Sequence, residues 1–129
     1  MAGTIVANTL NTDTGVFSTN NAYSGIASAW VNFSCPSSTV TVNASLNVSS
    51  VTRSASGQYV INFNTALADA NYTLLASCYA SNSGYPAFSN NVYGVNVSIV
   101  SSSQCYVMSH QTNTAQYQDN SYVSVAAFR

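Results

Sequence analysis

The sequence predicts an all-β protein, an antiparallel β-sandwich of the jelly-roll or immunoglobulin-like kind with about eight strands. Segments that alternate apolar and polar side chains, rich in Val, Ile, Tyr and Thr, recur along the chain, whereas no segment has the periodicity of an amphipathic helix. Short turn-forming runs separate these segments, as in an antiparallel sheet. The 129 residues are enough for one domain with one hydrophobic core.

The predicted strands follow the alternation along the chain. They begin, in chain order, at Ile26 (IASAWVNF), Thr39 (TVTVNASLNV), Ser49 (SSVTRS), Gly57 (GQYVINFN), Asn71 (NYTLLASCYA), Tyr93 (YGVNVSIVSS), Gln104 (QCYVMSH) and Ser121 (SYVSVAAF). In QYVINF, the side chains of Tyr59, Ile61 and Phe63 share one face of the strand. We expect this face to be core and the opposite face to be mixed.

Trp30 is the only tryptophan, and it lies in the first predicted strand. Ala27, Ala29, Val31 and Phe33 form one alternating set there, so Trp30 falls on the other, less apolar face. We expect Trp30 to cover the outside of the sheet or to pack against the N-terminal segment. The alternative is a platform for a sugar ring.

Residues 1–25 differ in character from the sandwich domain, which we assign to residues 26–129. They are rich in Asn, Thr, Ser and Gly, too polar to form a core of their own yet too apolar for a simple linker. An extended arm that lies on a neighbouring subunit or on a docking partner would explain both properties. The candidate attachment residues are the apolar positions of this arm: Ile5, Val6, Leu10, Val16 and Phe17.

The arm contains the triplet Asp13-Thr14-Gly15, around which aspartic proteases build a catalytic pair of carboxylates. In a dimeric protease, two such carboxylates would share one proton. The flanks disagree, because Thr12 stands where an apolar strand should end and Val16 where a small residue should follow. We therefore interpret the triplet as an Asx-type turn with Gly15 at positive φ, and a dimeric protease is the least favoured alternative.

Charged residues are rare in this sequence. Lys and Arg total 2, Asp and Glu total 3, and the net charge is −1. The chain therefore offers no basic surface for phosphates, so nucleic acid is not an expected partner, and it has no basic amphipathic face for anionic lipid. The opening residues lack the basic and apolar regions of a secretory signal, and no apolar run is long enough to span a bilayer, so we expect no membrane insertion.

The titratable residues lie far apart in the sequence and predict no catalytic, cofactor or metal site. Asp13, Asp69 and Asp119 fall in three separate turns, where each carboxylate would accept backbone hydrogen bonds, so no acid pair for glycoside cleavage is indicated. His110, the only histidine, ends a strand without an acid or nucleophile near it in sequence. We expect a protein that is not an enzyme and has no cofactor or metal.

The cysteine count is odd, with Cys35, Cys78 and Cys105. Their spacing matches neither a zinc site nor a Cys-x-x-Cys redox pair. We expect buried free thiols that act as small hydrophobic side chains, as is usual for a protein made in a reducing cytosol. A bridge between Cys78 and Cys105 is the alternative that spacing leaves open.

Two long connections, residues 81–91 and 110–120, carry aromatic residues among amides and hydroxyls. Loops on a rigid β scaffold often carry binding residues, and aromatic side chains give a large contact area at low entropic cost. The candidate receptor or glycan contacts are therefore Tyr85, Phe88 and Tyr117. The alternative is that Tyr85 and Phe88 cap the core beneath a long loop.

Extended stretches of this sequence, GIASAWVNF, NVSSVTRSASGQYVINFNTALADANY and the closing YVSVAAF, resemble a domain found in many bacteriophage fibre-type virion proteins. The resemblance runs from about Gly25 to Phe128, and GTIVANTLNTDTG resembles the segments that precede this domain. It implies a β-rich knob without enzymatic chemistry, in a symmetric and trimeric virion appendage. The chain departs from the family at SCPSS, where the family has an Asn/Gly turn, and in lacking a long fibre shaft.

These observations lead us to expect a structural protein located in the virion, a short tail-fibre or fibre-tip subunit that contacts a host receptor. A capsid decoration or head-fibre protein with the same knob is the alternative. From another class, a stand-alone carbohydrate-binding module could stack its Tyr-rich loops on sugars. The expected partners are two further copies in a homotrimer, other virion proteins through the arm, and a host cell-surface glycan. A nearly uncharged surface is a solubility liability for a free monomer, and a particle-bound oligomer reduces it.

Overall fold

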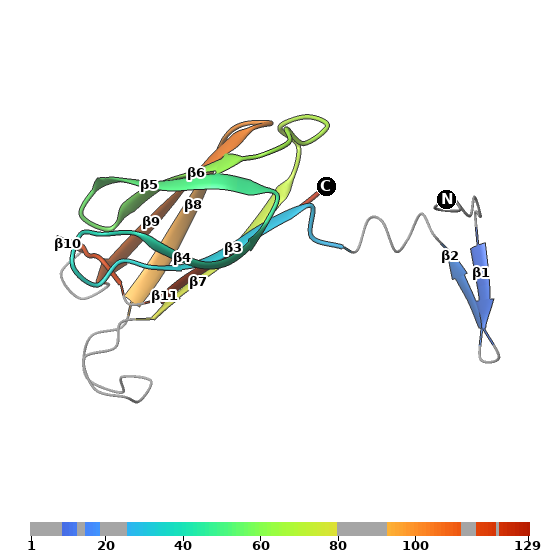
Figure 1. Cartoon of the computed structure of the whole chain (residues 1–129), viewed down its shortest axis with the longest axis horizontal. Helices are drawn as coiled ribbons and strands as arrows, with labels where there is room; N and C mark the ends of the chain where they lie inside the picture. The colour runs from blue at the N-terminus through green and yellow to red at the C-terminus, as the bar shows by residue number, and fades with distance from the viewer. Residues whose placement is uncertain (1–8, 13–14, 19–25, 80–92, 112–115, 121) are drawn as a thin grey trace, which may run out of the picture.

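The computed structural model of the chain describes residues 9–12, 15–18, 26–79, 93–111, 116–120 and 122–129. Two antiparallel sheets pack face to face, and no helix occurs in these residues (Figure 1). The all-β antiparallel sandwich is therefore confirmed. In the described part of the chain, no helix is long and apolar enough to cross a membrane.

The first sheet, which we call the β11 sheet, has four strands, and the second, the β9 sheet, has five. In spatial order, the β11 sheet consists of β4 (Thr41–Leu46), β3 (Ala29–Ser34), β11 (Tyr122–Phe128) and β7 (Thr73–Tyr79). The β9 sheet consists of β10 (Gln116–Tyr117), β9 (Gln104–Gln111), β6 (Gln58–Phe63) and β5 (Val48–Ala55), and β8 (Tyr93–Ser101) pairs with β9 as well.

The core lies between the two sheets and is built by the alternation in each strand. In β6, the predicted core residues Tyr59, Ile61 and Phe63 are all buried. The rings of Phe33 and Tyr59 meet edge to face across the sheets, with centroids 4.9 Å apart. The other fully buried side chains come from β3, β9 and β11 or from the segments next to β3 and β11, namely Ala29, Val31, Cys35, Cys105, Val107, Ser109, Asn120, Val123 and Ala127.

Asn47 turns the chain from the β11 sheet into the β9 sheet, between β4 and β5. Its φ of 54° is left-handed, a conformation that Asn tolerates better than most residues. The side-chain amide donates to the carbonyls of Ser28 (3.1 Å) and Thr65 (3.0 Å) and accepts from the Thr65 amide (2.7 Å). These bonds tie the corner to two neighbouring segments.

All eight predicted strands are present, with ends that move by a few residues. The structure adds the two-residue strand β10 and, inside the arm, a hairpin of β1 (Thr9–Thr12) and β2 (Gly15–Ser18). The register pairs Thr12 with Gly15 and Leu10 with Phe17. The turn predicted at Asp13 falls on residues 13 and 14, which lie outside the described residues. Among the described strands, β1 and β2 pair only with each other.

Candidate functional site

The outer face of the β11 sheet carries a row of apolar side chains that crosses all four strands. The register places Leu46 of β4 beside Trp30, Trp30 beside Ala126, and Ala126 beside Leu75 of β7. The opposite faces of β3 and β11 are buried, so this row points away from the core. Trp30 therefore lies on the outer face, as its sequence position predicts.

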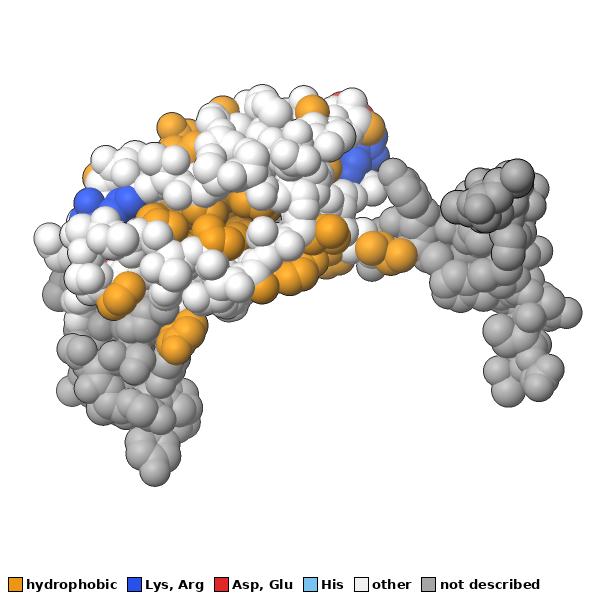
Figure 2. Space-filling model, viewed as in Figure 1, with side chains coloured by type: hydrophobic (Ala, Val, Ile, Leu, Met, Phe, Trp, Pro, Cys, Tyr) orange, Lys and Arg blue, Asp and Glu red, His pale blue; other side chains and the backbone are white. Residues whose placement is uncertain are grey.

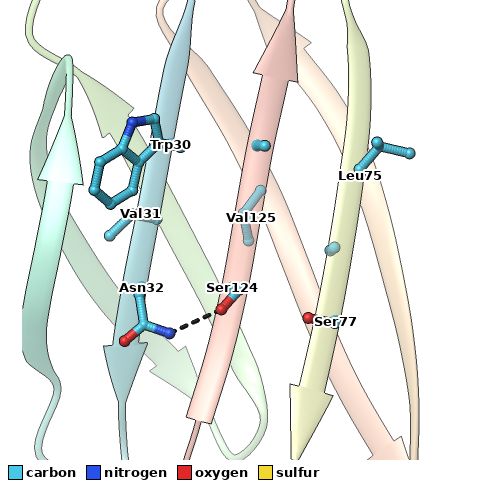
Figure 3. A pocket seen from close by; sticks show the side chains of 9 residues that line it. Trp30, Val31, Asn32, Leu75, Ser77, Ser124 and Val125 are labelled. Carbon is cyan, nitrogen blue, oxygen red and sulfur yellow. Dashed lines mark hydrogen bonds between the residues drawn. The ribbon is translucent and has the colours of Figure 1, made fainter. Parts of the chain in front are cut away.

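The row is largely open to solvent. Trp30 is 37% exposed, Leu46 is 47% exposed and Leu75 is 60% exposed. Because Ala126 is small and stands between Trp30 and Leu75, the surface sinks there into a shallow depression of about 370 Å³. Figure 3 looks onto this face, where the Trp30 indole is seen broadside over one side of the depression and Leu75 borders the other.

A polar row runs parallel to the apolar one, two residues away from it on β3, β11 and β7. Asn32 lies beside Ser124, and Ser124 lies beside Ser77. The Asn32 amide is engaged at both ends, because its Nδ2 donates to Ser124 Oγ (2.8 Å) and its Oδ1 accepts from Asn43 Nδ2 (2.8 Å). We call the two rows together, Leu46, Trp30, Ala126 and Leu75 with Asn32, Ser124 and Ser77, the Trp30 face. It carries no charged side chain and can hold an apolar group or a flat ring, but it offers no acid or base.

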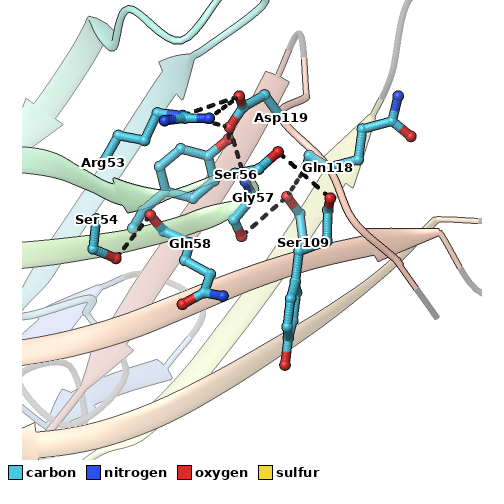
Figure 4. A network of polar contacts seen from close by, with 10 residues as sticks. Arg53, Ser54, Ser56, Gly57, Gln58, Ser109, Gln118 and Asp119 are labelled. Carbon is cyan, nitrogen blue, oxygen red and sulfur yellow. Dashed lines mark hydrogen bonds and ion pairs between the residues drawn. The ribbon is translucent and has the colours of Figure 1, made fainter.

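The second notable cluster is centred on the Asp119 carboxylate at one end of the sandwich (Figure 4). Arg53 donates from Nε to Oδ1 (2.9 Å) and Oδ2 (3.0 Å), and from Nη2 to Oδ2 (2.8 Å). The Gly57 amide (2.8 Å) and the Tyr59 hydroxyl (3.0 Å) donate to Oδ1. The cluster thus fastens the segment before β11 to the β5–β6 hairpin.

The protonation states of Asp119 and Tyr59 indicate that this cluster stabilises the fold and does not take part in catalysis. Burial acts to raise the pKa of Asp119, but the hydrogen bonds from Arg53, Gly57 and Tyr59 outweigh it and hold the pKa below its ordinary value. Burial is the main cause that raises the pKa of Tyr59. Asp119 is therefore ionised and Tyr59 neutral at pH 7, and neither group is poised to exchange a proton there.

Gly57 allows the backbone at Ser109 and Gln118 to approach the β5–β6 turn closely enough for Asp119 to reach its hydrogen-bond partners. Its φ is +64°, and a Cβ atom at this position would lie 2.5 Å from both Gln118 N and Ser109 O. Ser109 N donates to Gly57 O (2.8 Å), and Gln118 N donates to Ser109 O (3.1 Å). Only glycine combines this backbone conformation with this approach.

The other titratable side chains form no catalytic arrangement among the described residues. Asp69 accepts the Asn71 amide (2.7 Å), as predicted for a turn carboxylate, and it also pairs with Arg129 at the surface. His110 lies on β9, opposite Tyr117, and its Nδ1 has no hydrogen-bond partner in the described part of the chain. No group of three His, Cys, Asp or Glu side chains that could hold a metal occurs in that part.

The cysteines are all free, so the predicted thiols are confirmed and the alternative bridge between Cys78 and Cys105 is wrong. Cys35 and Cys105 are buried, whereas Cys78 is half-buried. Burial raises the pKa of Cys105 to about 11, and burial followed by the nearby Asp119 charge raises that of Cys35. Thiols with raised pKa values are poor nucleophiles at pH 7.

Of the candidate receptor contacts, the structure places only Tyr117, which is 46% exposed on β10. Tyr85, Phe88, Ile5 and Val6 lie outside the described residues. The arm residues Leu10, Val16 and Phe17 belong to the β1–β2 hairpin. The apolar row and the Arg53–Asp119 pair could not be predicted from the sequence, because both depend on strand order, although the outward position of Trp30 is a usable signal.

Comparison of the chain with protein-family models, with curated proteins and with solved structures finds no match.

Proposed function

We propose that the chain is a non-enzymatic structural subunit of a bacteriophage virion, a short tail fibre or fibre tip exposed on the particle. The resemblance of residues 25–128 to fibre-type domains motivates this proposal. The structural observation that carries it is that the few charged side chains of the described residues are paired with one another. Asp13 lies outside the described residues, and the other charged residues form the ion pairs Arg53–Asp119 and Arg129–Asp69.

This distribution of charge leaves a surface of hydroxyls, amides and apolar groups. Figure 2 shows basic side chains only toward the two ends of the sandwich in that view, with uncharged surface between them. Such a surface supports a role in which the subunit is held in place and its solubility is not limiting. It gives little support to the binding of a charged substrate or to acid–base chemistry.

The N-terminal segment supports an oligomeric, particle-bound subunit. A hairpin with strands of four residues is marginally stable by itself in water, so it requires another surface. In the proposed function this segment attaches the sandwich to other virion subunits, in a homotrimer. A capsid decoration or head fibre built on the same knob would use the segment in the same way.

One observation favours a carbohydrate-binding module as a second candidate. The half-exposed indole of Trp30 lies beside the hydroxyls of Ser124 and Ser77, a combination that could stack on and hydrogen-bond a neutral sugar. A module of this kind should bind glycans as a monomer and without the arm. A virion subunit should be found on particles.

Purification of particles tests the proposal. A tagged chain should sediment with density-purified phage, whereas the same chain without residues 1–23 should keep the circular dichroism of a β protein but be absent from particles. Normal incorporation of the shortened chain would exclude the arm as the anchor. Absence of the tagged full chain from particles would contradict the virion role.

A further inference from the structure

Two parts of this chain are suited to a contact with another surface. One is the row Leu46, Trp30 and Leu75 of the Trp30 face, which is 37% to 60% exposed. The other is the β1–β2 hairpin, whose strands pair with no sandwich strand in the described residues. Exposed apolar surface on a soluble protein usually marks a contact with another molecule, and a short hairpin needs support.

We infer that the β1–β2 hairpin of one chain docks on the Trp30 face of a second copy. The inference deepens the attachment role of the arm and rests on the proposed function, since it names the surface that the arm contacts. Each chain would then donate one hairpin and receive one. A contact between two different surfaces of identical subunits can close into a ring, as a trimer requires.

The chemistry of the Trp30 face favours an uncharged, largely apolar occupant. The Asn32 amide already uses one of its two N–H donors on Ser124 and one of its two oxygen lone pairs on Asn43, so half of its capacity for a polar ligand is taken. Neither ion pair of the sandwich contributes to the lining of the depression. The hairpin strands, TLNT and GVFS, are uncharged, and their register pairs Leu10 with Phe17.

The dimensions of the two surfaces also agree. Strands of four residues are about 13 Å long, at about 3.3 Å per residue. The apolar row crosses from β4 to β7, three strand spacings of about 4.8 Å each, or about 14 Å in total. A hairpin laid on the sheet would therefore cover the row from Leu46 to Leu75, in the manner of one sheet packed on another.

A second copy is favoured over the same chain because the apolar row of the Trp30 face stays exposed in the single chain. Residues 19–25 alone separate the hairpin from Ile26, and Trp30 follows four residues later. A contact within one chain would cover the row, yet Leu75 and Leu46 remain about half exposed or more. A neighbouring chain supplies the same hairpin and the same face.

Trp30 is the only tryptophan, so its fluorescence reports the proposed contact directly. We expect the emission of the full chain to lie at short wavelength when concentrated and to shift to longer wavelength on dilution. The midpoint of this shift should coincide with dissociation measured by sedimentation. Phe17→Asp in the hairpin and Leu75→Asp on the face should each give monomers with long-wavelength emission at all concentrations. Tyr106→Ser, at a residue 38% exposed on the β9 sheet, is the matched control and should behave as the unmodified chain.

Other results would overturn the inference. Emission that does not depend on concentration would mean that the hairpin docks within its own chain or not at all. Dissociation without a change in emission would place the subunit contact elsewhere. A shift produced only by neutral hexoses or N-acetylhexosamines, in a monomer, would make the face a saccharide site. Incorporation of the Phe17→Asp chain into particles would reject the arm as virion anchor while leaving the fluorescence result to decide the docking.

Discussion

Arg53 and Asp119, 66 residues apart in sequence, form an ion pair in which the guanidinium Nη2 lies 2.8 Å from Oδ2 and Nε also donates to the carboxylate. Side-chain exposure is 25% for Arg53 and 13% for Asp119, whereas both partners of the Arg129–Asp69 pair are 40% exposed. The same kind of ion pair thus occurs in two solvent environments.

Asp119→Ala should destabilise the protein far more than Asp69→Ala. The first change leaves Arg53, the Tyr59 hydroxyl and the Gly57 amide without their shared acceptor, at a cost of about 2–3 kcal/mol in the free energy of unfolding. Exposed ion pairs contribute little to stability because water screens them, so Asp69→Ala is the matched control. Urea unfolding of the variants measures both values, and equal losses would show that the Asp119 cluster is not a structural anchor.

Alkaline pH should destabilise the protein through Cys105. Burial raises the pKa of this thiol to about 11 in the folded state, whereas an unfolded cysteine titrates near about 8.5. Between these values the unfolded chain has lost the proton and the folded chain keeps it, so stability falls as pH rises, by at most about 1.4 kcal/mol per pH unit. Cys105→Ala should flatten this dependence in unfolding measured from pH 8 to 11. An unchanged slope would assign the effect to other groups.

Gly57→Ala should destabilise the β5–β6 turn. The added Cβ would lie 2.5 Å from Gln118 N and Ser109 O, and alanine is strained at a φ of +64°. We expect a loss of about 2 kcal/mol or more, since contact and strain act together. Ser56→Ala in the same turn removes only a long, exposed hydrogen bond and should change stability by less than about 0.5 kcal/mol. A melting temperature for Gly57→Ala close to that of Ser56→Ala would mean that the backbone around Gln118 shifts to accommodate the added Cβ at little cost in stability.

The loop aromatics test the contact with the host. Tyr117 is 46% exposed, as a residue that contacts a receptor should be. If Tyr85, Phe88 and Tyr117 all serve binding, replacing the three together by Ser should leave the melting temperature unchanged. Adsorption of the phage to cells should then fall. Normal adsorption would favour a head decoration or a structural spacer, and a lower melting temperature would favour the core-capping alternative for Tyr85 and Phe88.

The fold could be predicted from the sequence because the alternation that makes a strand is local. Tyr59, Ile61 and Phe63 identify their buried face without reference to any other segment. The β1–β2 hairpin and β10 escaped prediction because strands of four and two residues are too short to display a period.

The Trp30 face and the Asp119 cluster depend on which strands pair with one another. This pairing cannot be read from the alternation within single strands. Trp30 meets Ala126, and Ala126 meets Leu75, only because β11 inserts between β3 and β7. Arg53 and Asp119 likewise meet only because β9 pairs with both β10 and β6, which brings the segment after β10 beside the β5–β6 hairpin. The outward position of Trp30 was predictable, whereas the row around it was not.

Electron cryomicroscopy of purified particles tests the virion role most directly. A reconstruction should contain symmetric copies of a two-sheet knob on the outside of the particle, with the hairpin of each copy on the Trp30 face of its neighbour. Density at the tail tip would identify a fibre subunit, and density on the head would identify a decoration protein. Particles that lack this knob altogether, from cells that produce the chain in quantity, would contradict the virion role.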